Sequence, residues 1–128
     1  MNEPITIYVI SEDVVFKALL NKILKLNLST PLIVNYNSFS KVKSIVPGVR
    51  VDLIILDDVI TGSASHEVVN LLRLEKRIPC PIYYFSYAEY EEEKKALYQG
   101  ANFFFNKPFN PGEIAQHIVY TINEKMNI

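Results

Sequence analysis

A single stretch decides the fold: Val51-Asp52-Leu53-Ile54-Ile55-Leu56-Asp57-Asp58. It is an almost unbroken apolar run of strand length that ends on two carboxylates. Continuous rather than alternating aliphatic residues are typical of a strand buried on both faces of a helix-covered parallel sheet. Open α/β sheets bind ligands outside the carboxyl ends of their strands, which places Asp57 where chemistry is expected. The two carboxylates could equally open a solvated loop, and only the rest of the chain distinguishes these interpretations.

The composition excludes several classes of protein. The chain has 128 residues, 49% of them hydrophobic, which suffices for one domain with a buried core. A formal net charge of -1 and the absence of a Lys/Arg run argue against direct binding of nucleic acid. No signal peptide and no apolar run of membrane-spanning length is present. The single cysteine, Cys80, fits a structural thiol in a reducing compartment, so we expect a cytoplasmic domain without membrane contact.

The remaining chain alternates between strand and helix patterns. Further strands are predicted from β-branched and aromatic runs at 5–10, 32–36, 81–86 and 101–105. Apolar residues at helical spacing predict five helices: 14–26, a short one from about residue 38 to 46, one ending near 75, one ending at Gly100, and a last one from about 111. This order is that of a βα-repeated parallel sheet.

Polar side chains cluster where the predicted strands end: Ser11-Glu12-Asp13, Asp57-Asp58, Ser86 and Lys107. The carboxyl ends of parallel strands share one edge of the sheet, so these groups are expected to meet. A phosphorylatable aspartate needs such a set, because a carboxylate attacks phosphorus weakly unless nearby cations and hydroxyls neutralise the phosphoryl oxygens. A hard, oxygen-liganded cation such as magnesium suits that role.

The chain resembles the receiver domain of two-component response regulators over about residues 5–125. The resemblance rests on the DLIILD run at 52–57 with Gly62 five residues on, on Ser86 after the fourth strand, and on the GANFFFNKPF segment at 100–109. It implies a single receiver domain over 1–128. It also implies a flavodoxin-like (βα)5 fold, with a five-stranded parallel sheet in the order 2-1-3-4-5 and helices on both faces.

The same resemblance assigns roles residue by residue. Asp57 would be the phosphoacceptor, Ser86 the hydroxyl that hydrogen-bonds the phosphoryl group, and Lys107 its cationic partner. The Lys107-Pro108 peptide would be cis. Phe104 would be the aromatic switch residue that reports phosphorylation to the far surface. The domain would receive its phosphoryl group from a histidine kinase or phosphotransfer protein and would not itself be an enzyme beyond self-phosphorylation and self-dephosphorylation.

Magnesium would be held by Glu12, Asp57 and the backbone carbonyl of Val59. Ser11 stands where the family has a carboxylate, so magnesium binding is expected to be weakened. Asp13 could replace that carboxylate or could cap the following helix, and capping is the favoured interpretation. Further departures are Tyr87, which would crowd the entrance to the acceptor, and Thr61, which replaces a proline.

Two other functions remain open. The first is a phosphorylation-independent, receiver-like interaction module with a vestigial pocket, which Ser11 favours and the set Asp57, Ser86 and Lys107 opposes. The second is a metal-dependent phosphatase, which needs a second acid or base and has only Asp58 or Asp13 to supply it. As partners, the resemblance also allows a homodimer through the fourth helix, fifth strand and last helix, and a downstream output domain.

Several residues are interpreted as structural. His66 and His117 lie in separate predicted helices and are expected to face solvent. The run Phe103-Phe104-Phe105 is expected to be mainly a buried strand, and the Lys107 side chain to lie at an exposed strand end. Tyr90 and Tyr98, on one predicted helix, form either a docking stripe or a half-buried face.

Overall fold

Five parallel strands form a central sheet in a computed structural model that describes residues 4–29, 32–58, 65–87 and 90–126. The strands lie side by side in the order β2-β1-β3-β4-β5, and each neighbouring pair is parallel. Their bounds are β1 (Ile5–Ile10), β2 (Leu32–Asn37), β3 (Leu53–Asp57), β4 (Ile82–Ser86) and β5 (Phe103–Asn106). The α/β class with a parallel sheet is therefore confirmed, and the observed strand order is the one that the resemblance implied.

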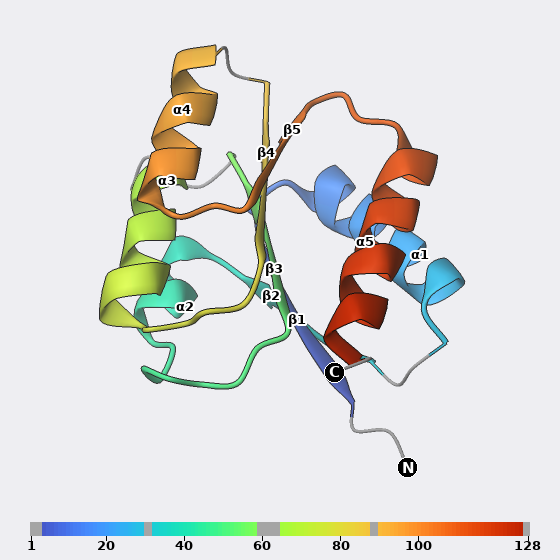
Figure 1. Cartoon of the computed structure of the whole chain (residues 1–128), viewed down its shortest axis with the longest axis horizontal. Coiled ribbons are helices and arrows are strands. Elements are labelled where there is room, and N and C mark those ends of the chain that lie inside the picture. The colour runs from blue at the N-terminus through green and yellow to red at the C-terminus, as the bar shows by residue number, and fades with distance from the viewer. Residues whose placement is uncertain (1–3, 30–31, 59–64, 88–89, 127–128) are drawn as a thin grey trace.

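Helices cover both faces of the sheet (Figure 1). On one face lie α1 (Val14–Asn27) and α5 (Pro111–Met126). On the other lie α2 (Phe39–Lys43), α3 (Ser65–Asn70) and α4 (Tyr90–Gln99), and α3 continues into a π-helical segment, η1 (Leu71–Glu75). Among the helices of the described residues, none combines the length and the apolarity needed to cross a membrane.

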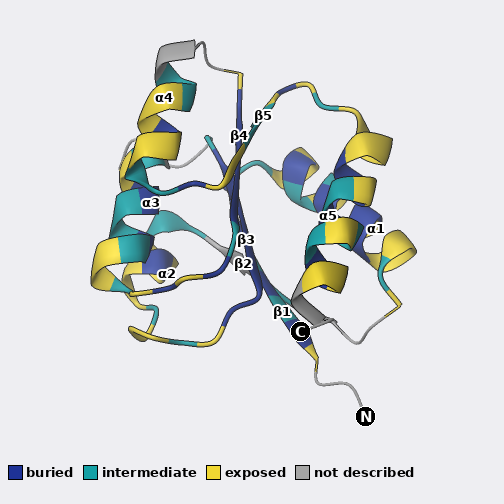
Figure 2. Cartoon of the chain, in the orientation of Figure 1, coloured by how far each residue is buried: buried dark blue, intermediate teal, exposed yellow. Residues whose placement is uncertain are grey.

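Strand β3 lies at the centre of the sheet, and all five of its residues are buried (Figure 2). Leu53 and Ile55 pack into the hydrophobic cluster under α1 and α5. Ile54 and Leu56 pack into the second cluster, under α2, α3 and α4. A strand with a core on each face cannot alternate apolar with polar residues, which explains the unbroken apolar run in its sequence.

The expectation of a buried β5 is wrong in part. Phe103 is 39% exposed, and Phe104 and Phe105 are half-buried. The physical reason is position, because β5 pairs with β4 alone and forms an edge of the sheet. The phenylalanine run is thus a partly exposed edge strand whose rings lie against β4 and α5.

The guanidinium of Arg73, in η1, hydrogen-bonds both the segment that follows η1 and Gly100, which precedes β5. The side chain of Arg73 donates to the carbonyls of Ile78 and Cys80 at 2.7 Å and to the carbonyl of Gly100 at 2.9 and 3.0 Å. Gly100 has φ of +120°, and a Cβ there would lie 2.9 Å from Cγ of Arg73. Glycine is therefore required both by the backbone and by the close approach of Arg73.

Candidate functional site

Four strand ends bring the polar residues together at one edge of the sheet. In the parallel register of the sheet, Ile10 of β1 lies opposite Leu56 of β3, and Asp57 of β3 lies opposite Phe85 of β4. Ser86 of β4 lies opposite Asn106 of β5. The residues that follow β1 and β5, Ser11 and Lys107, therefore lie beside the ends of β3 and β4. The structure brings Ser11, Asp57, Asp58, Ser86 and Lys107 into one hydrogen-bonded group.

Asp57 lies at the centre of this group and has no exposed surface. Its Oδ2 accepts a 2.6 Å hydrogen bond from the Ser11 hydroxyl. Its Oδ1 accepts from the Lys107 ammonium and, at 2.9 Å, from the backbone N–H of Asp58. Burial raises the pKa of the Asp57 carboxyl, against the lowering effect of the Lys107 and Ser11 hydrogen bonds.

Lys107 is the cation of the site. Its side chain is only 5% exposed, so the expectation of an exposed strand end is wrong. The ammonium pairs with Asp57 and lies 3.2 Å from Oδ1 of Asp58. It also lies 4.9 Å from the ring centre of Tyr87. Burial opposes the charge on Lys107, but the two carboxylates outweigh burial and raise the pKa of its ammonium. The Lys107-Pro108 peptide is cis, as the resemblance implied.

Asp58 accepts hydrogen bonds from three donors on two segments of the chain. Its Oδ2 accepts from the Ser86 hydroxyl at 3.0 Å and from the backbone N–H of Tyr87 at 3.2 Å, and Lys107 donates to its Oδ1. Burial opposes its ionisation, but the hydrogen bonds from Lys107 and Ser86 hold the pKa of this carboxyl below its ordinary value. Sequence reasoning assigned Asp58 no role beside the acceptor except as a possible second acid or base. Its place next to Asp57 was the only sequence feature that pointed to a part in the site.

The residues assigned to magnesium do not assemble a site among the described residues. Asp13 caps α1 through Oδ1, which accepts from the backbone N–H groups of Val15 and Phe16 at 2.9 and 3.2 Å, as the favoured interpretation stated. Glu12 is exposed, and Val59, like Thr61, lies outside the described residues. Nowhere in residues 4–29, 32–58, 65–87 and 90–126 do three His, Cys, Asp or Glu side chains converge. Lys107 and Ser11 already bond the two oxygens of Asp57, so the described residues do not bring the expected magnesium ligands together.

The expected switch residue, Phe104, lies on the opposite side of β5 from His117. It is half-buried and stacks on the ring of Tyr84, with 5.6 Å between ring centres and 18° between planes. The Tyr84 hydroxyl donates to Oε1 of Glu92 at 2.5 Å, and Nδ1 of His66 lies 3.3 Å from the same oxygen. His66 is therefore engaged between α3 and α4, and the expectation that it simply faces solvent is wrong.

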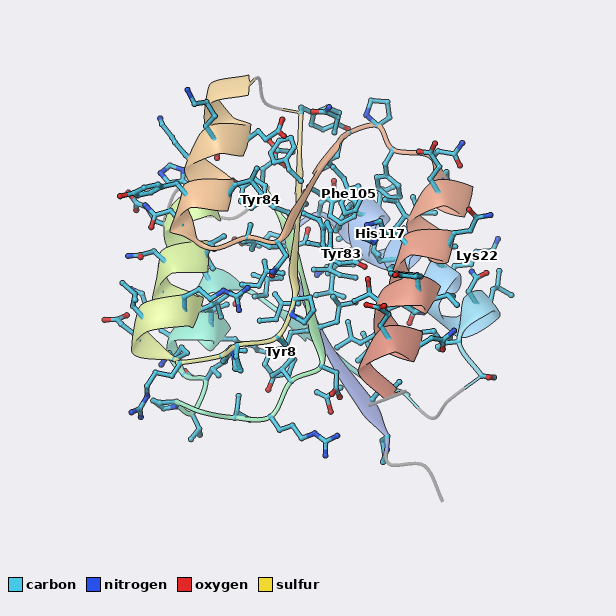
Figure 3. The ribbon with its side chains drawn as sticks, in the orientation of Figure 1. Tyr8, Lys22, Tyr83, Tyr84, Phe105 and His117 are labelled. Carbon is cyan, nitrogen blue, oxygen red and sulfur yellow. The ribbon has the colours of Figure 1, made fainter. Side chains whose placement is uncertain are left out.

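His117 is also engaged, which corrects the second histidine prediction. It projects from α5 toward Tyr83 and Phe105 (Figure 3). Its ring meets those of Phe103, Phe105 and Tyr83 edge-to-face at 4.5–5.2 Å. Its Nδ1 lies 2.7 Å from the Tyr83 hydroxyl, and that hydroxyl also lies 2.5 Å from Oγ1 of Thr121. Burial raises the pKa of the Tyr83 phenol to about 12.

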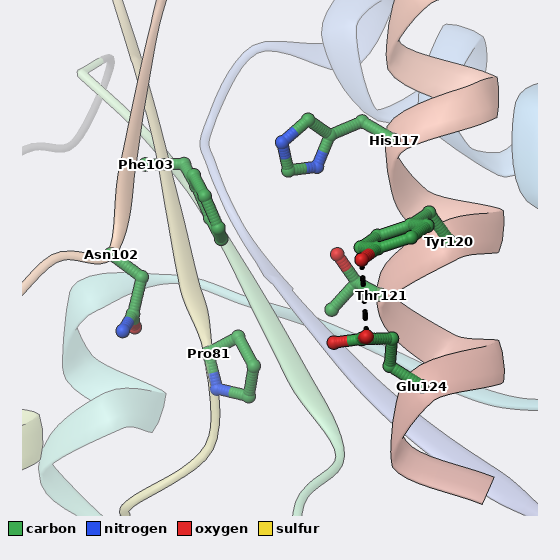
Figure 4. A pocket seen from close by; sticks show the side chains of 7 residues that line it. All are labelled: Pro81, Asn102, Phe103, His117, Tyr120, Thr121 and Glu124. Atoms are coloured by element: carbon green, nitrogen blue, oxygen red, sulfur yellow. Dashed lines mark hydrogen bonds between the residues drawn. The ribbon is translucent and has the colours of Figure 1, made fainter. Parts of the chain in front are cut away.

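A shallow pocket lies over this polar group, between β5 and α5 (Figure 4). Phe103 and Tyr120 form apolar walls, and the Tyr120 hydroxyl donates to Oε1 of Glu124 at 3.0 Å. On α4, which lies on the other face of the sheet, Tyr98 is 90% exposed, so the half-buried alternative is wrong for it. The side chain of Tyr90 lies outside the described part of the chain.

No protein-family model and no curated protein sequence matches the chain, but solved structures match its fold. A response regulator receiver protein from Pseudoalteromonas atlantica has a TM-score of 0.80 at 16% identity, over 94% of this chain and 98% of that one. A CheY-like receiver domain protein from Methanospirillum hungatei JF-1 has 0.80 at 15%, over 98% of each. The BeF3-activated receiver domain of DrrB, from Thermotoga maritima, has 0.76 at 13%, over 94% and 99%. The chain therefore has the fold of response regulator receiver domains.

Proposed function

We propose that residues 1–128 form a single receiver domain of a cytoplasmic two-component system, with Asp57 as its phosphoacceptor. The observation that carries the proposal is the pairing of Asp57 with the Lys107 ammonium at the carboxyl edge of the sheet, with the Ser86 hydroxyl on the adjacent carboxylate. A buried carboxylate beside one fixed cation and one hydroxyl is the arrangement that a phosphoacceptor requires. The receiver fold supports the same function.

In the proposed reaction, a carboxylate oxygen of Asp57 attacks the phosphorus of a phosphohistidine on a kinase or phosphotransfer protein. An O–P bond forms as the N–P bond breaks. The leaving imidazole nitrogen takes a proton from solvent, and Asp57 becomes an acyl phosphate. Lys107 would follow the negative charge from the carboxylate to a phosphoryl oxygen, and Ser86 would donate its hydroxyl proton to another. No step is assigned to magnesium, because the described residues do not bring its expected ligands together.

The response would reach the surface through β5. A phosphoryl group on Asp57 would draw Ser86 and Lys107 towards itself. Ser86 ends the strand that carries Tyr84, and Phe104 stacks on Tyr84. A shift of Phe104 would alter the face of α4, β5 and α5, which is the proposed surface for a homodimer, a target or an output domain. The domain would act as a signalling acceptor and not as an enzyme with a separate substrate.

A second candidate function is a receiver-like module that binds partners without phosphorylation. It is favoured by the Ser11 hydroxyl on Oδ2 of Asp57, together with the cap that engages Asp13. In this alternative the polar group at the strand ends stabilises the fold and has no phosphoryl chemistry. The intact combination of Asp57, Ser86 and Lys107 favours the first proposal.

Beryllofluoride, which forms a tetrahedral analogue of an aspartyl phosphate, distinguishes a phosphoacceptor domain from a phosphorylation-independent binding module. We expect that beryllofluoride added with magnesium chloride shifts the amide NMR signals of Ser86, Tyr87 and Phe104. The Asp57→Asn variant should show no such shifts. Unchanged spectra of the unmodified protein after long incubation would contradict the phosphoacceptor proposal and support the binding module.

A further inference from the structure

We propose that the Asp58 carboxylate occupies the phosphoryl position in the resting protein, as a tethered anion that must leave before Asp57 can react. This inference rests on the proposed function for the identity of the incoming group. That Asp58 occupies an anion position is inferred from its own hydrogen bonds. The device is autoinhibitory, because an internal anion competes for the donors that an external phosphoryl group needs.

The donors around Asp58 converge as they would on an oxyanion. A hydroxyl, a backbone N–H and an ammonium reach one carboxylate from the end of β4, from the residue after it, and from the segment after β5. Two of these donors, Ser86 and Lys107, are the groups assigned to the phosphoryl oxygens. In the resting structure the Ser86 hydroxyl is hydrogen-bonded to Asp58, the residue next to the acceptor.

Burial agrees with this interpretation. Asp57 has no exposed surface, whereas the side chain of the adjacent Asp58 is 23% exposed. Lys107 bridges the two carboxylates, so its one positive charge is already shared. A phosphoryl donor can reach Asp57 only after Asp58 has moved outward and released its donors.

The charge-assisted hydrogen bond to Asp58 also explains why this carboxylate stays bound to its donors in the resting protein. The ammonium bond is of the stronger, ionised class, and two further donors fix the orientation of the carboxylate. Because Asp58 is the next residue along the chain, it is present at a high local concentration that a free anion must overcome. Removing this carboxylate should therefore open an anion site beside the acceptor and leave the Lys107 ammonium to Asp57 alone.

The test is made in an Asp57→Asn background, so that its result does not depend on phosphorylation or on repulsion by Asp57. Inorganic phosphate is titrated into Asp57→Asn and into Asp57→Asn/Asp58→Ala, and the amide signals of Ser86 and Tyr87 are followed by NMR. We expect saturable shifts at about tenfold lower phosphate in the double variant. The triple variant with Lys107→Ala should lose them. Asp58→Asn replaces Asp58→Ala if the latter does not fold.

Equal phosphate affinity with and without the Asp58 carboxylate would overturn the inference, as would shifts that persist without Lys107. The proposed function is tested separately, by labelling proteins that retain Asp57 with acetyl phosphate. If the double variant binds phosphate but Asp57 never becomes labelled, even in Asp58→Ala, the anion device stands and the phosphoacceptor proposal fails. If Asp57 becomes labelled but the Asp58 carboxylate has no effect on phosphate binding, the phosphoacceptor proposal stands and the inference about Asp58 fails.

Discussion

The Ser11 hydroxyl donates a 2.6 Å hydrogen bond to Oδ2 of Asp57, from a residue 46 positions earlier in the chain. It satisfies one oxygen of a buried carboxylate without adding charge. A carboxylate at the same position would instead face Asp57 directly and would need a cation between them. Ser11 therefore bonds the buried Asp57 carboxylate without placing a second negative charge beside it.

The Ser11→Asp variant should reverse this property. Without magnesium, repulsion between the two buried carboxylates should lower the free energy of unfolding by about 1–3 kcal/mol. Magnesium should restore that stability and should bind more tightly than to the unmodified protein. Thermal unfolding with and without magnesium, together with magnesium titrations followed by tyrosine fluorescence, measures both effects. Ser11→Ala is the control, because it removes the hydrogen bond without adding charge; equal magnesium affinity in Ser11→Asp and unmodified protein would contradict this explanation.

The ion pair between Lys107 and Asp57 should contribute strongly to stability. Lys107→Ala leaves the buried Asp57 carboxyl without its cation, and the loss of one partner of a buried pair costs about 3–5 kcal/mol. Denaturant unfolding of Lys107→Ala, Asp57→Asn and the double variant measures the coupling, which should be roughly 0.5–3 kcal/mol. A loss in Lys107→Ala no larger than the ~0.5 kcal/mol of an ordinary surface substitution would show that the pair is not formed in solution.

Tyr83 should ionise later than an exposed tyrosine. The pKa of its phenol is raised from 10.0 to about 12, because burial opposes ionisation more strongly than the hydrogen bond with Thr121 favours it. A raised acid pKa gives stability that is fully present below pH 10 and is lost as the pH rises through about 12. Phenolate absorbance of the eight tyrosines should show a late transition that is absent from Tyr83→Phe. Complete titration near pH 10 in the folded protein would exclude the buried network.

The sequence predicted the parts of the fold that local pattern controls. The apolar run at 53–56 predicted a strand with a core on each face. The meeting of the polar residues at the strand ends was predicted because parallel strands share one carboxyl edge. Asp13 was recognised as a cap because Phe16 begins the apolar helix pattern just after it.

Other features depend on tertiary position and leave no local signal. An edge strand and a central strand share the same aromatic composition, so the exposure of Phe103 could not be predicted. The burial of Lys107 depends on the two carboxylates and the Tyr87 ring around it. His117 pairs with a tyrosine 34 residues away, and only the packing of α5 on β4 and β5 brings them together. The hydrogen bonds to Asp58 could not be predicted for the same reason, because two of their donors lie 28 and 49 residues away along the chain.

Phosphorylation of Asp57 can be measured by intact-mass and peptide analysis of the protein after exposure to acetyl phosphate. The experiment compares unmodified protein, Asp57→Asn and Asp58→Asn, each with and without magnesium. We expect one hydroxylamine-sensitive phosphoryl group on Asp57, none on Asp57→Asn, and faster labelling of Asp58→Asn. No label on either the unmodified protein or Asp58→Asn, or equal labelling of Asp57→Asn, would contradict the proposal that Asp57 accepts a phosphoryl group.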